Sequence, residues 1–386
     1  MKSISFLGYL KIHQLSIQTL QTQSHQYSFL NCYCGASPPS SLLQYLRASF
    51  GFSHERALQI SQRLKHKTPR NPDSVISFFK SHGFSQPHIK SIITKTPQLL
   101  FCDPETTLGP KISFFREKGL SETDVVGLVV SNPCLLHTSI EKCMKPTLSI
   151  IHSLAGMEKF QIKLLKHSMR LNPEKLAANV TVFKNCDVPA RFITNLLLKQ
   201  SRALGMDPDR FSEAVKTVKK MGFNPSSHRF VEAVSAILNL SHSVWDKKFE
   251  VYRSFSWSNG EILGAFHNHP WCICLSGEKI KRGLNFFMKE LGWSSSYIVS
   301  CACILSMSLE KRIMPRYRLF KVLVLKGLID KDRKITASIF RISEQQFMSK
   351  YVMKYKTDLP EILKIYEGSG RLKGQNAEDG EESMVQ

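Results

Sequence analysis

The chain has 386 residues, of which 42% are hydrophobic, so it is long enough to bury an extensive core. It carries 53 Lys and Arg against 31 Asp and Glu, which gives a formal net charge of +22. No run of about 20 apolar residues occurs, so no membrane span is expected. The excess of cations indicates a polyanionic partner, with nucleic acid the foremost candidate.

The N-terminal region has the composition of a targeting segment. The first 54 residues contain no Asp or Glu, are rich in Ser, Gln and Leu, and hold only three permanent cations: Lys2, Lys11 and Arg47. This composition resembles an organellar transit peptide, although arginine is scarce. No compact apolar segment precedes a small-residue cleavage site, which disfavours a secretory signal. We therefore predict a disordered transit peptide over residues 1–40.

A repeat follows. The stretches FFKSHGFSQPHIKSIITKTPQLL and FFREKGLSETDVVGLVVSNPCLL begin at Phe78 and Phe114. Three pairs of residues stand at the same offset of 36 positions: Gly83 and Gly119, Pro97 and Pro133, Pro110 and Pro146. A fixed period of this length is typical of proteins built from tandem helical repeats.

Each unit is predicted to contain two helices. The first helix ends at the glycine, which favours a left-handed C-cap, and Ser85 or Ser121 then caps the second helix. In a later unit Ser258 and Glu261 have the spacing of a capping box. Pro97 and Pro133 end the second helix, and a Leu-Leu pair after each proline indicates one tight turn buried between neighbours.

The same phase can be followed along the chain through nine junction residues. These are Gly51, Gly83, Gly119, Gly156, Cys186, Gly222, Ser256, Gly292 and Gly327. Such helix pairs cannot bury their apolar faces alone, so they stack on one another. We predict an all-α fold, an α-solenoid forming a curved superhelix of about nine units, over residues 41–365. Residues 366–386 are predicted to form a disordered acidic tail.

Several motifs are similar to those of one known family. The segment WSNGEILGAFHNHP from Trp257 to Pro270 resembles the pattern WS-x-x-E-[IV]-x-x-A-F-x-x-x-P of the mitochondrial transcription termination factor (mTERF) family. The segment SLEKRIMPRYR from Ser308 to Arg318 resembles the SLEKR-x-x-PR block of its land-plant organellar members, and KYVMKY from Lys350 to Tyr355 fits the same group.

The resemblance implies a helical superhelix that binds organellar nucleic acid. For this chain it favours a regulator that binds double-stranded DNA and acts in transcription termination or regulation. An organellar RNA-binding factor for intron splicing or rRNA maturation stays open, as does a protein-interaction scaffold that binds no nucleic acid. The mitochondrion is the expected location, with the chloroplast as the alternative. Expected protein partners are organellar transcription, splicing or ribosome-assembly proteins, and the chain is expected to be a monomer without a cofactor.

Candidate contacts to nucleic acid gather near the C-terminal end of the repeats. The stretch from Glu278 to Lys334 holds thirteen cations and five acids. Guanidinium and ammonium groups are the usual ligands of phosphate. We predict that the nucleic-acid-binding residues are Lys281, Arg282, Lys311, Arg312, Arg316, Arg318 and Lys321. The competing interpretation is that an acid such as Glu310 pairs with one of these arginines and clamps adjacent repeats.

Other side chains are better explained by packing. The phase of Phe114, Phe115, Phe286 and Phe287 predicts core residues rather than stacking platforms, and Trp257 and Trp293 follow helix junctions where an apolar residue recurs. The basic stripes Lys163–Lys166–Arg170 and Lys216–Lys219–Lys220 are predicted to be solvated helix faces.

Enzymatic and metal chemistry are not expected. The ten cysteines include the pairs Cys272–Cys274 and Cys301–Cys303, whose single-residue spacing does not favour zinc. His267 and His269 have the same spacing, and Cys301 and Cys303 are predicted to lie in a helix. No nucleotide-binding loop, nucleophile elbow or paired-histidine motif occurs in the sequence, so neither a catalytic nor a metal site is predicted.

Overall fold

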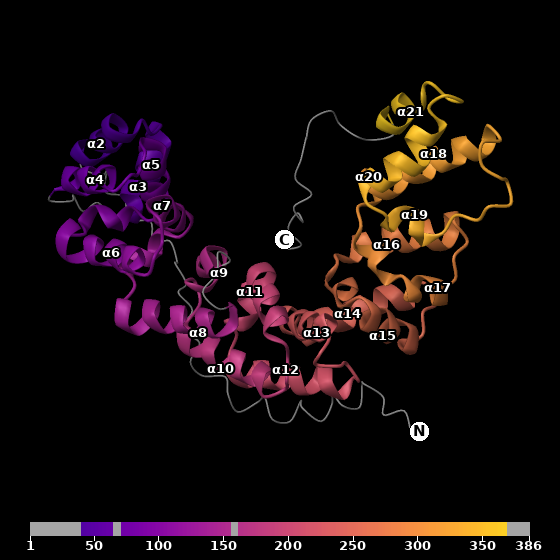
Figure 1. The fold of residues 1–386 in the computed structure, drawn as a ribbon, viewed down its shortest axis with the longest axis horizontal. Coiled ribbons are helices and arrows are strands. Elements are labelled where there is room, and N and C mark those ends of the chain that lie inside the picture. Colours follow the sequence, from indigo (N-terminus) through magenta and orange to yellow (C-terminus); the bar gives the residue numbers. More distant parts are fainter. Residues whose placement is uncertain (1–39, 65–70, 156–160, 369–386) are drawn as a thin grey trace. The chain divides into compact units, whose positions relative to one another are not determined.

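The computed structural model describes residues 40–64, 71–155 and 161–368 (Figure 1). Every regular element in these residues is a helix, which confirms the predicted all-α class. Within the same residues, no helix has both the length and the apolar character needed to cross a membrane. Most of the predicted transit peptide and the acidic tail beyond residue 368 lie outside the described residues. The last helix runs to Gly368, past the predicted start of the tail at residue 366.

Contacts between residues divide the chain into two units, Met1–Thr68 and Pro69–Gln386. The predicted repeat domain over 41–365 therefore falls in two units. In the first unit, α2 (Ser40–Phe50) packs against α3 (His54–Arg63). The turn between them contains Gly51 at φ 60° and Ser53, whose hydroxyl accepts a hydrogen bond from the Arg56 amide and so caps α3.

The second unit begins with two repeats of the same four-part pattern, in which a helix, a second helix and a short 3-10 helix are followed by a π-helical turn that opens the next repeat. The elements are α4 (Pro72–Ser81), α5 (Gln86–Lys95), η2 (Pro97–Phe101), η3 (Pro104–Leu108), α6 (Gly109–Glu117), α7 (Glu122–Ser131), η4 (Pro133–His137) and η5 (Ile140–Met144). Pro97 and Pro133 start the 3-10 helices, and the Leu-Leu pairs that follow are buried. The predicted buried turn is thus confirmed.

The remaining elements continue the pattern, with a more degenerate middle. They are α8 (Lys145–Ala155), α9 (Gln161–Ser168), α10 (Pro173–Lys184), α11 (Ala190–Leu204), α12 (Pro208–Lys220), α13 (His228–Asn239), α14 (His242–Arg253), α15 (Asn259–Asn268), η6 (Pro270–Cys274), α16 (Gly277–Leu284), η7 (Asn285–Glu290), α17 (Ser295–Ser300), η8 (Ala302–Ser306), η9 (Leu309–Ile313), α18 (Met314–Leu325), α19 (Ala337–Arg341), α20 (Glu344–Phe347), η10 (Met348–Val352), η11 (Met353–Tyr355) and α21 (Ile362–Gly368).

Successive repeats stack through their second helices. Each of α5, α7, α9, α11, α13, α15 and α17 packs against the next member of this series. First helices also meet one another, as in the pairs α8–α10, α10–α12 and α14–α16. Because each element contacts only its near neighbours along the chain, the second unit is an α-solenoid.

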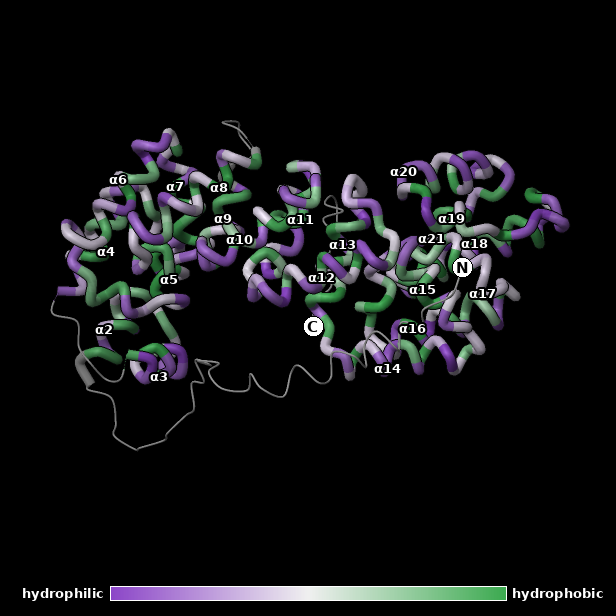
Figure 2. The backbone as a smooth tube through the Cα atoms, turned by 90° about the horizontal axis from the view of Figure 1, so that it is seen from below, coloured by the Kyte–Doolittle hydropathy of each residue, from purple (hydrophilic) through white to green (hydrophobic). Residues whose placement is uncertain are grey.

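Aromatic and aliphatic side chains fill the space between the helix layers. Hydrophobic and hydrophilic residues alternate along each helix, as Figure 2 shows. Phe115 and Phe287 are fully buried, and Phe114, Phe286, Trp257 and Trp293 are at most 9% exposed. The prediction that these rings belong to the core is therefore confirmed.

The junction residues adopt the left-handed conformation that glycine favours. Gly119 has φ 83°, and Ser256, which replaces glycine in its unit, has φ 62°. In the degenerate middle the prediction was wrong by one residue: Asp187, at φ 55°, makes the turn rather than Cys186. Aspartate tolerates this region because its short polar side chain can hydrogen-bond locally. Gly156 lies outside the described residues.

Candidate nucleic-acid interface

The structure separates the seven predicted contact residues into two groups. Lys281, Arg282, Lys311, Arg318 and Lys321 are exposed, on α16, η9 and α18. Arg312 is half-buried, and Arg316 is completely buried. Only the exposed group can reach a phosphate without a change in the fold.

Arg316 is a structural residue. Its Nη1 donates to the carbonyl oxygens of Ile339, Phe340 and Ile342 at 3.0, 3.2 and 2.7 Å, and its Nη2 lies 3.0 Å from Glu344 Oε2. The guanidinium carbon lies 4.6 Å from the centroid of the Phe347 ring. The prediction that Arg316 binds nucleic acid is therefore wrong, and the competing interpretation of an arginine clamped by an acid describes it.

Arg312 donates to two of the same carbonyls as Arg316. Its Nε donates to Phe340 O at 2.9 Å and its Nη2 donates to Ile342 O at 2.7 Å. These carbonyls end α19, where the helix leaves acceptors without intrahelical partners. The SLEKR block thus serves the fold: Ser308 caps η9 by accepting from the Lys311 amide, and the two arginines hold the end of the same repeat. Since its guanidinium is engaged in this way, Arg312 is also removed from the predicted interface.

This use of a cation recurs in other repeats. Lys248 of α14 donates to Leu275 O at 2.6 Å, Lys279 of α16 to Ser306 O at 2.7 Å, and Arg210 of α12 to Leu238 O at 3.0 Å. Each bond joins the first helix of a repeat to the end of the same repeat, 27 or 28 residues later. Burial lowers the pKa of Lys248 and of Lys279. We call these bonds the intra-repeat clamps.

Three of the exposed cations make contacts at the surface. Lys281 Nζ lies 3.4 Å from Glu278 Oε1, and Arg282 pairs with Glu310, which joins α16 to η9. Lys321 Nζ lies 5.5 Å from the centroid of the Tyr317 ring. Exposed pairs of this kind contribute about 0–1 kcal/mol, so a phosphate can replace the carboxylate at little cost.

The other basic stripes have mixed roles. Arg170 Nη2 donates to Ser131 O at the end of α7 at 2.9 Å, so it holds two neighbouring repeats together. Lys163 is exposed, and so are Lys216, Lys219 and Lys220 along α12.

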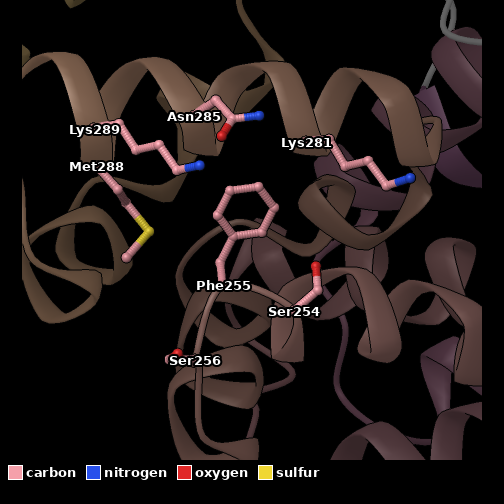
Figure 3. A pocket seen from close by; sticks show the side chains of 7 residues that line it. All are labelled: Ser254, Phe255, Ser256, Lys281, Asn285, Met288 and Lys289. Atoms are coloured by element: carbon pink, nitrogen blue, oxygen red, sulfur yellow. The ribbon is translucent and has the colours of Figure 1, made fainter.

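A recess lies beside the exposed cations of α16. One wall is the turn after α14, with Ser254, Phe255 and Ser256, and the other is one face of α16 and η7 (Figure 3). That face presents Lys281, Asn285, Met288 and Lys289. The free volume is about 500 Å³. We call it the Phe255 recess. The repeat pattern did not reveal it, because the residue one position before the junction varies from Phe50 and His82 to Lys118, Met221 and Lys326.

The helix wall of this recess has its π-helical turns at its end, because η7 follows α16 rather than preceding it. At most junctions the amide after the left-handed residue bonds to a carbonyl five residues earlier, as from Phe84 to Phe79 and from Trp257 to Tyr252. At Gly292 the Trp293 amide instead reaches the Phe287 carbonyl, six residues earlier. This longer reach follows the π-helical turns of η7, whereas the π-helical turns η3, η5 and η9 open their repeats.

The cysteine and histidine pairs do not form a metal centre in the part of the chain that the structure describes. Burial raises the pKa of Cys272 and of Cys274 to about 12, which keeps both thiols protonated. Cys272 is buried two residues after Pro270, the place that Leu99 takes after Pro97. Cys301 ends α17 and Cys303 lies in the 3-10 helix η8, rather than in one continuous helix as predicted.

The helical repeats and the exposed cations place this chain in the class of basic helical-repeat proteins. The chain matches the family model described as mTERF over residues 76–227 and 157–348. These overlapping matches cover more than half of the chain, which therefore belongs to the mTERF family. Proteins of this family are non-enzymatic, nucleic-acid-binding regulators of organellar gene expression. A comparison with curated proteins gave no match.

Proposed function

We propose that this protein binds double-stranded nucleic acid in an organelle and regulates transcription there. The observation that supports this is the set of exposed cations between Glu278 and Lys334. Ten of the thirteen cations are exposed after Arg316, Arg312 and Lys279 are assigned to the fold, against five exposed acids. They are Lys281, Arg282, Lys289, Lys311, Arg318, Lys321, Lys326, Lys331, Arg333 and Lys334.

The charges suit the phosphate backbone rather than a protein surface. Large hydrophobic side chains that are exposed in the described residues are few and lie on separate elements: Phe101, Tyr297, Leu325 and Met353. A scaffold for protein partners would favour a continuous apolar surface. Phosphate contacts give affinity and position without reading sequence, so this set supports binding but names no target site.

The mitochondrion is the proposed compartment, from the resemblance to mitochondrial members of the family. The test is to crosslink the full-length protein to nucleic acid inside living cells of its source, purify it and sequence what is bound. We expect organellar DNA from the mitochondrial genome. Recovery of mitochondrial transcripts alone would show that the ligand is RNA rather than duplex DNA. Recovery of chloroplast sequences would contradict the proposed location. Recovery of no organellar nucleic acid above a mock purification would refute the proposal.

A further inference from the structure

The Phe255 recess combines three kinds of chemistry in one place. Figure 3 shows the Phe255 ring pointing between the side chains of Lys281 and Lys289, with Asn285 above it. Positions 281, 285 and 289 lie on one face of the continuous α16–η7 helix because they are four residues apart. The recess therefore offers two ammonium groups, one amide and one aromatic face.

Its polar groups are available for a ligand. In the residues that the structure describes, the Lys289 ammonium and the Asn285 amide make no hydrogen bond or ion pair. Lys281 makes only its surface pair with Glu278. An amide with two donors and one acceptor oxygen, placed between two cations, can hydrogen-bond a neutral polar group while the cations hold an anion.

The aromatic ring is also available. Phe255 is half-buried and has no ring partner among the described residues, whereas nearby rings pair, as Phe286 does with Tyr317 at 5.2 Å between centroids. Met288 adds an apolar, adaptable side chain to the same wall. Aromatic faces of this kind stack on nucleobases without preference for sequence.

The presence of ammonium groups, an amide and an aromatic ring in one recess favours some classes of ligand over others. Phosphate alone would use the two lysines and leave the ring and the amide without a role. An apolar ligand would leave the two ammonium groups and the Asn285 amide without a role. A volume of about 500 Å³ is within the range of about 300–1,000 Å³ typical of small-molecule sites, and is large enough for a base with its sugar.

We propose that the Phe255 recess binds one unpaired nucleotide of a nucleic-acid strand. Lys281 and Lys289 hold the phosphates on either side, the base stacks on Phe255 against Met288, and Asn285 hydrogen-bonds the edge of the base. The inference rests on the proposed binding of nucleic acid and adds to it a site for an unpaired base, because a base inside a regular duplex cannot reach the ring. The Phe255 recess thereby gives the protein a preference for single-stranded segments at this point of the surface.

The test compares three probes of one mixed sequence, about 12 nucleotides long, at fixed low salt: single-stranded RNA, single-stranded DNA and duplex DNA. We expect Phe255→Ala to weaken single-strand binding by roughly 5- to 150-fold, the effect of losing one stacked base, and to leave duplex binding within about twofold. Phe255→Tyr should keep single-strand affinity. Lys289→Gln should reduce the salt slope by about one.

Phe101→Ala is the matched control, since Phe101 of η2 is a half-exposed phenylalanine in a different repeat. It should leave binding of every probe unchanged. Circular dichroism and the melting temperature establish that each variant is folded. Equal single-strand affinity of RNA and DNA would indicate recognition of base and phosphate only, and tighter binding of RNA would add a contact to the 2′-hydroxyl. Both results support the site.

Two outcomes separate this inference from the proposed function. If the unmodified protein binds duplex DNA but Phe255→Ala leaves single-strand affinity unchanged, or reduces duplex and single-strand affinity equally, the recess is not a nucleotide site and the proposed function stands. If the unmodified protein does not bind the duplex probe, the proposed function itself is wrong, whatever its affinity for the single strands.

Discussion

Arg316 and Arg318 stand two residues apart and have opposite environments. Arg316 faces the interior, where three backbone carbonyls, Glu344 and the Phe347 ring surround it, while Arg318 faces solvent. The same network continues to the last helix, because the Tyr366 hydroxyl donates to Glu344 Oε1 at 3.0 Å. A buried charge with this many partners belongs to the stability of the C-terminal elements.

We predict that Arg316→Met destabilises the protein by about 3–5 kcal/mol, because it leaves the buried side of Glu344 without its cation and the Ile339 carbonyl without its donor. Arg316→Lys should also destabilise, since an ammonium cannot reproduce the planar fork. Arg318→Met, at an exposed site, should cost less than about 1 kcal/mol. Urea denaturation measures all three. A fully stable Arg316→Met protein that no longer binds nucleic acid would contradict the structural role.

The sequence could not distinguish these arginines. Helical spacing placed Arg312 and Arg316 near one another, but a positive charge on a helix is exposed far more often than buried. The decisive partners, Ile339 to Glu344, lie 23 to 28 residues later, across a turn whose path the repeat pattern does not specify. Phe287 and Trp293 were predictable as core residues because their burial follows from helical phase alone.

At the scale of the element, the 3-10 helices connect neighbouring repeats through polar contacts as well as packing. His269 lies between α15 and η6, and its Nε2 is 2.6 Å from Ser306 Oγ at the end of η8. Burial, with a smaller effect of the nearby Arg229, lowers the pKa of His269 from 6.5 to about 4. The imidazole is therefore neutral in the folded protein at neutral pH.

This shift gives a pH dependence of known sign. The unfolded chain takes up a proton on His269 near pH 6.5 and the folded chain only near pH 4, so the stabilisation is complete above the unfolded pKa and falls as the pH decreases between these values. We expect up to about 2 kcal/mol to be lost between pH 7 and pH 5. The measurement is the free energy of unfolding in urea at both pH values. His269→Gln should be less sensitive to pH over this interval, and identical slopes for the two proteins would contradict the assignment.

The pattern of elements was largely readable from the sequence. Glycine, serine and proline have strong local preferences, so the helix ends at Gly119, Ser121 and Pro133 were predicted correctly. The π-helical turns of η7 were not predicted, because Gly292 keeps the ordinary spacing of 36 residues from Ser256. The Phe255 recess beside these turns was missed because the spacing of the junction residues does not report where π-helical turns lie.

At the scale of the whole molecule, charge is the property that bears on function. A net charge of +22 is spread over 386 residues, but the intra-repeat clamps and Arg316 remove part of it from the surface. The exposed cations on η9 and α18 remain at the surface, where they can contact phosphates. Binding to duplex DNA should therefore release counterions and weaken as salt rises.

We predict that duplex affinity falls roughly 100-fold between 50 and 200 mM salt, the effect expected for about four phosphate contacts. Reversal of Lys311, Arg318 and Lys321 to Glu should reduce the salt slope by about three and the affinity at least about tenfold. The control reverses Lys80 of α4, Lys118 directly after α6 and Lys142 of η5, which are exposed cations, and changes the net charge equally. Equal losses in both triple variants would show that only the net charge matters.

The clamps also have a consequence for how the chain folds. The bonds from Lys248 and Lys279 each span 27 residues, and the bond from the Ala337 amide to the Tyr297 hydroxyl spans 40. None of these requires the closure of a long loop, so each costs little chain entropy to form. A repeat can become ordered with the help of its neighbour alone, and order can then spread along the second unit in either direction.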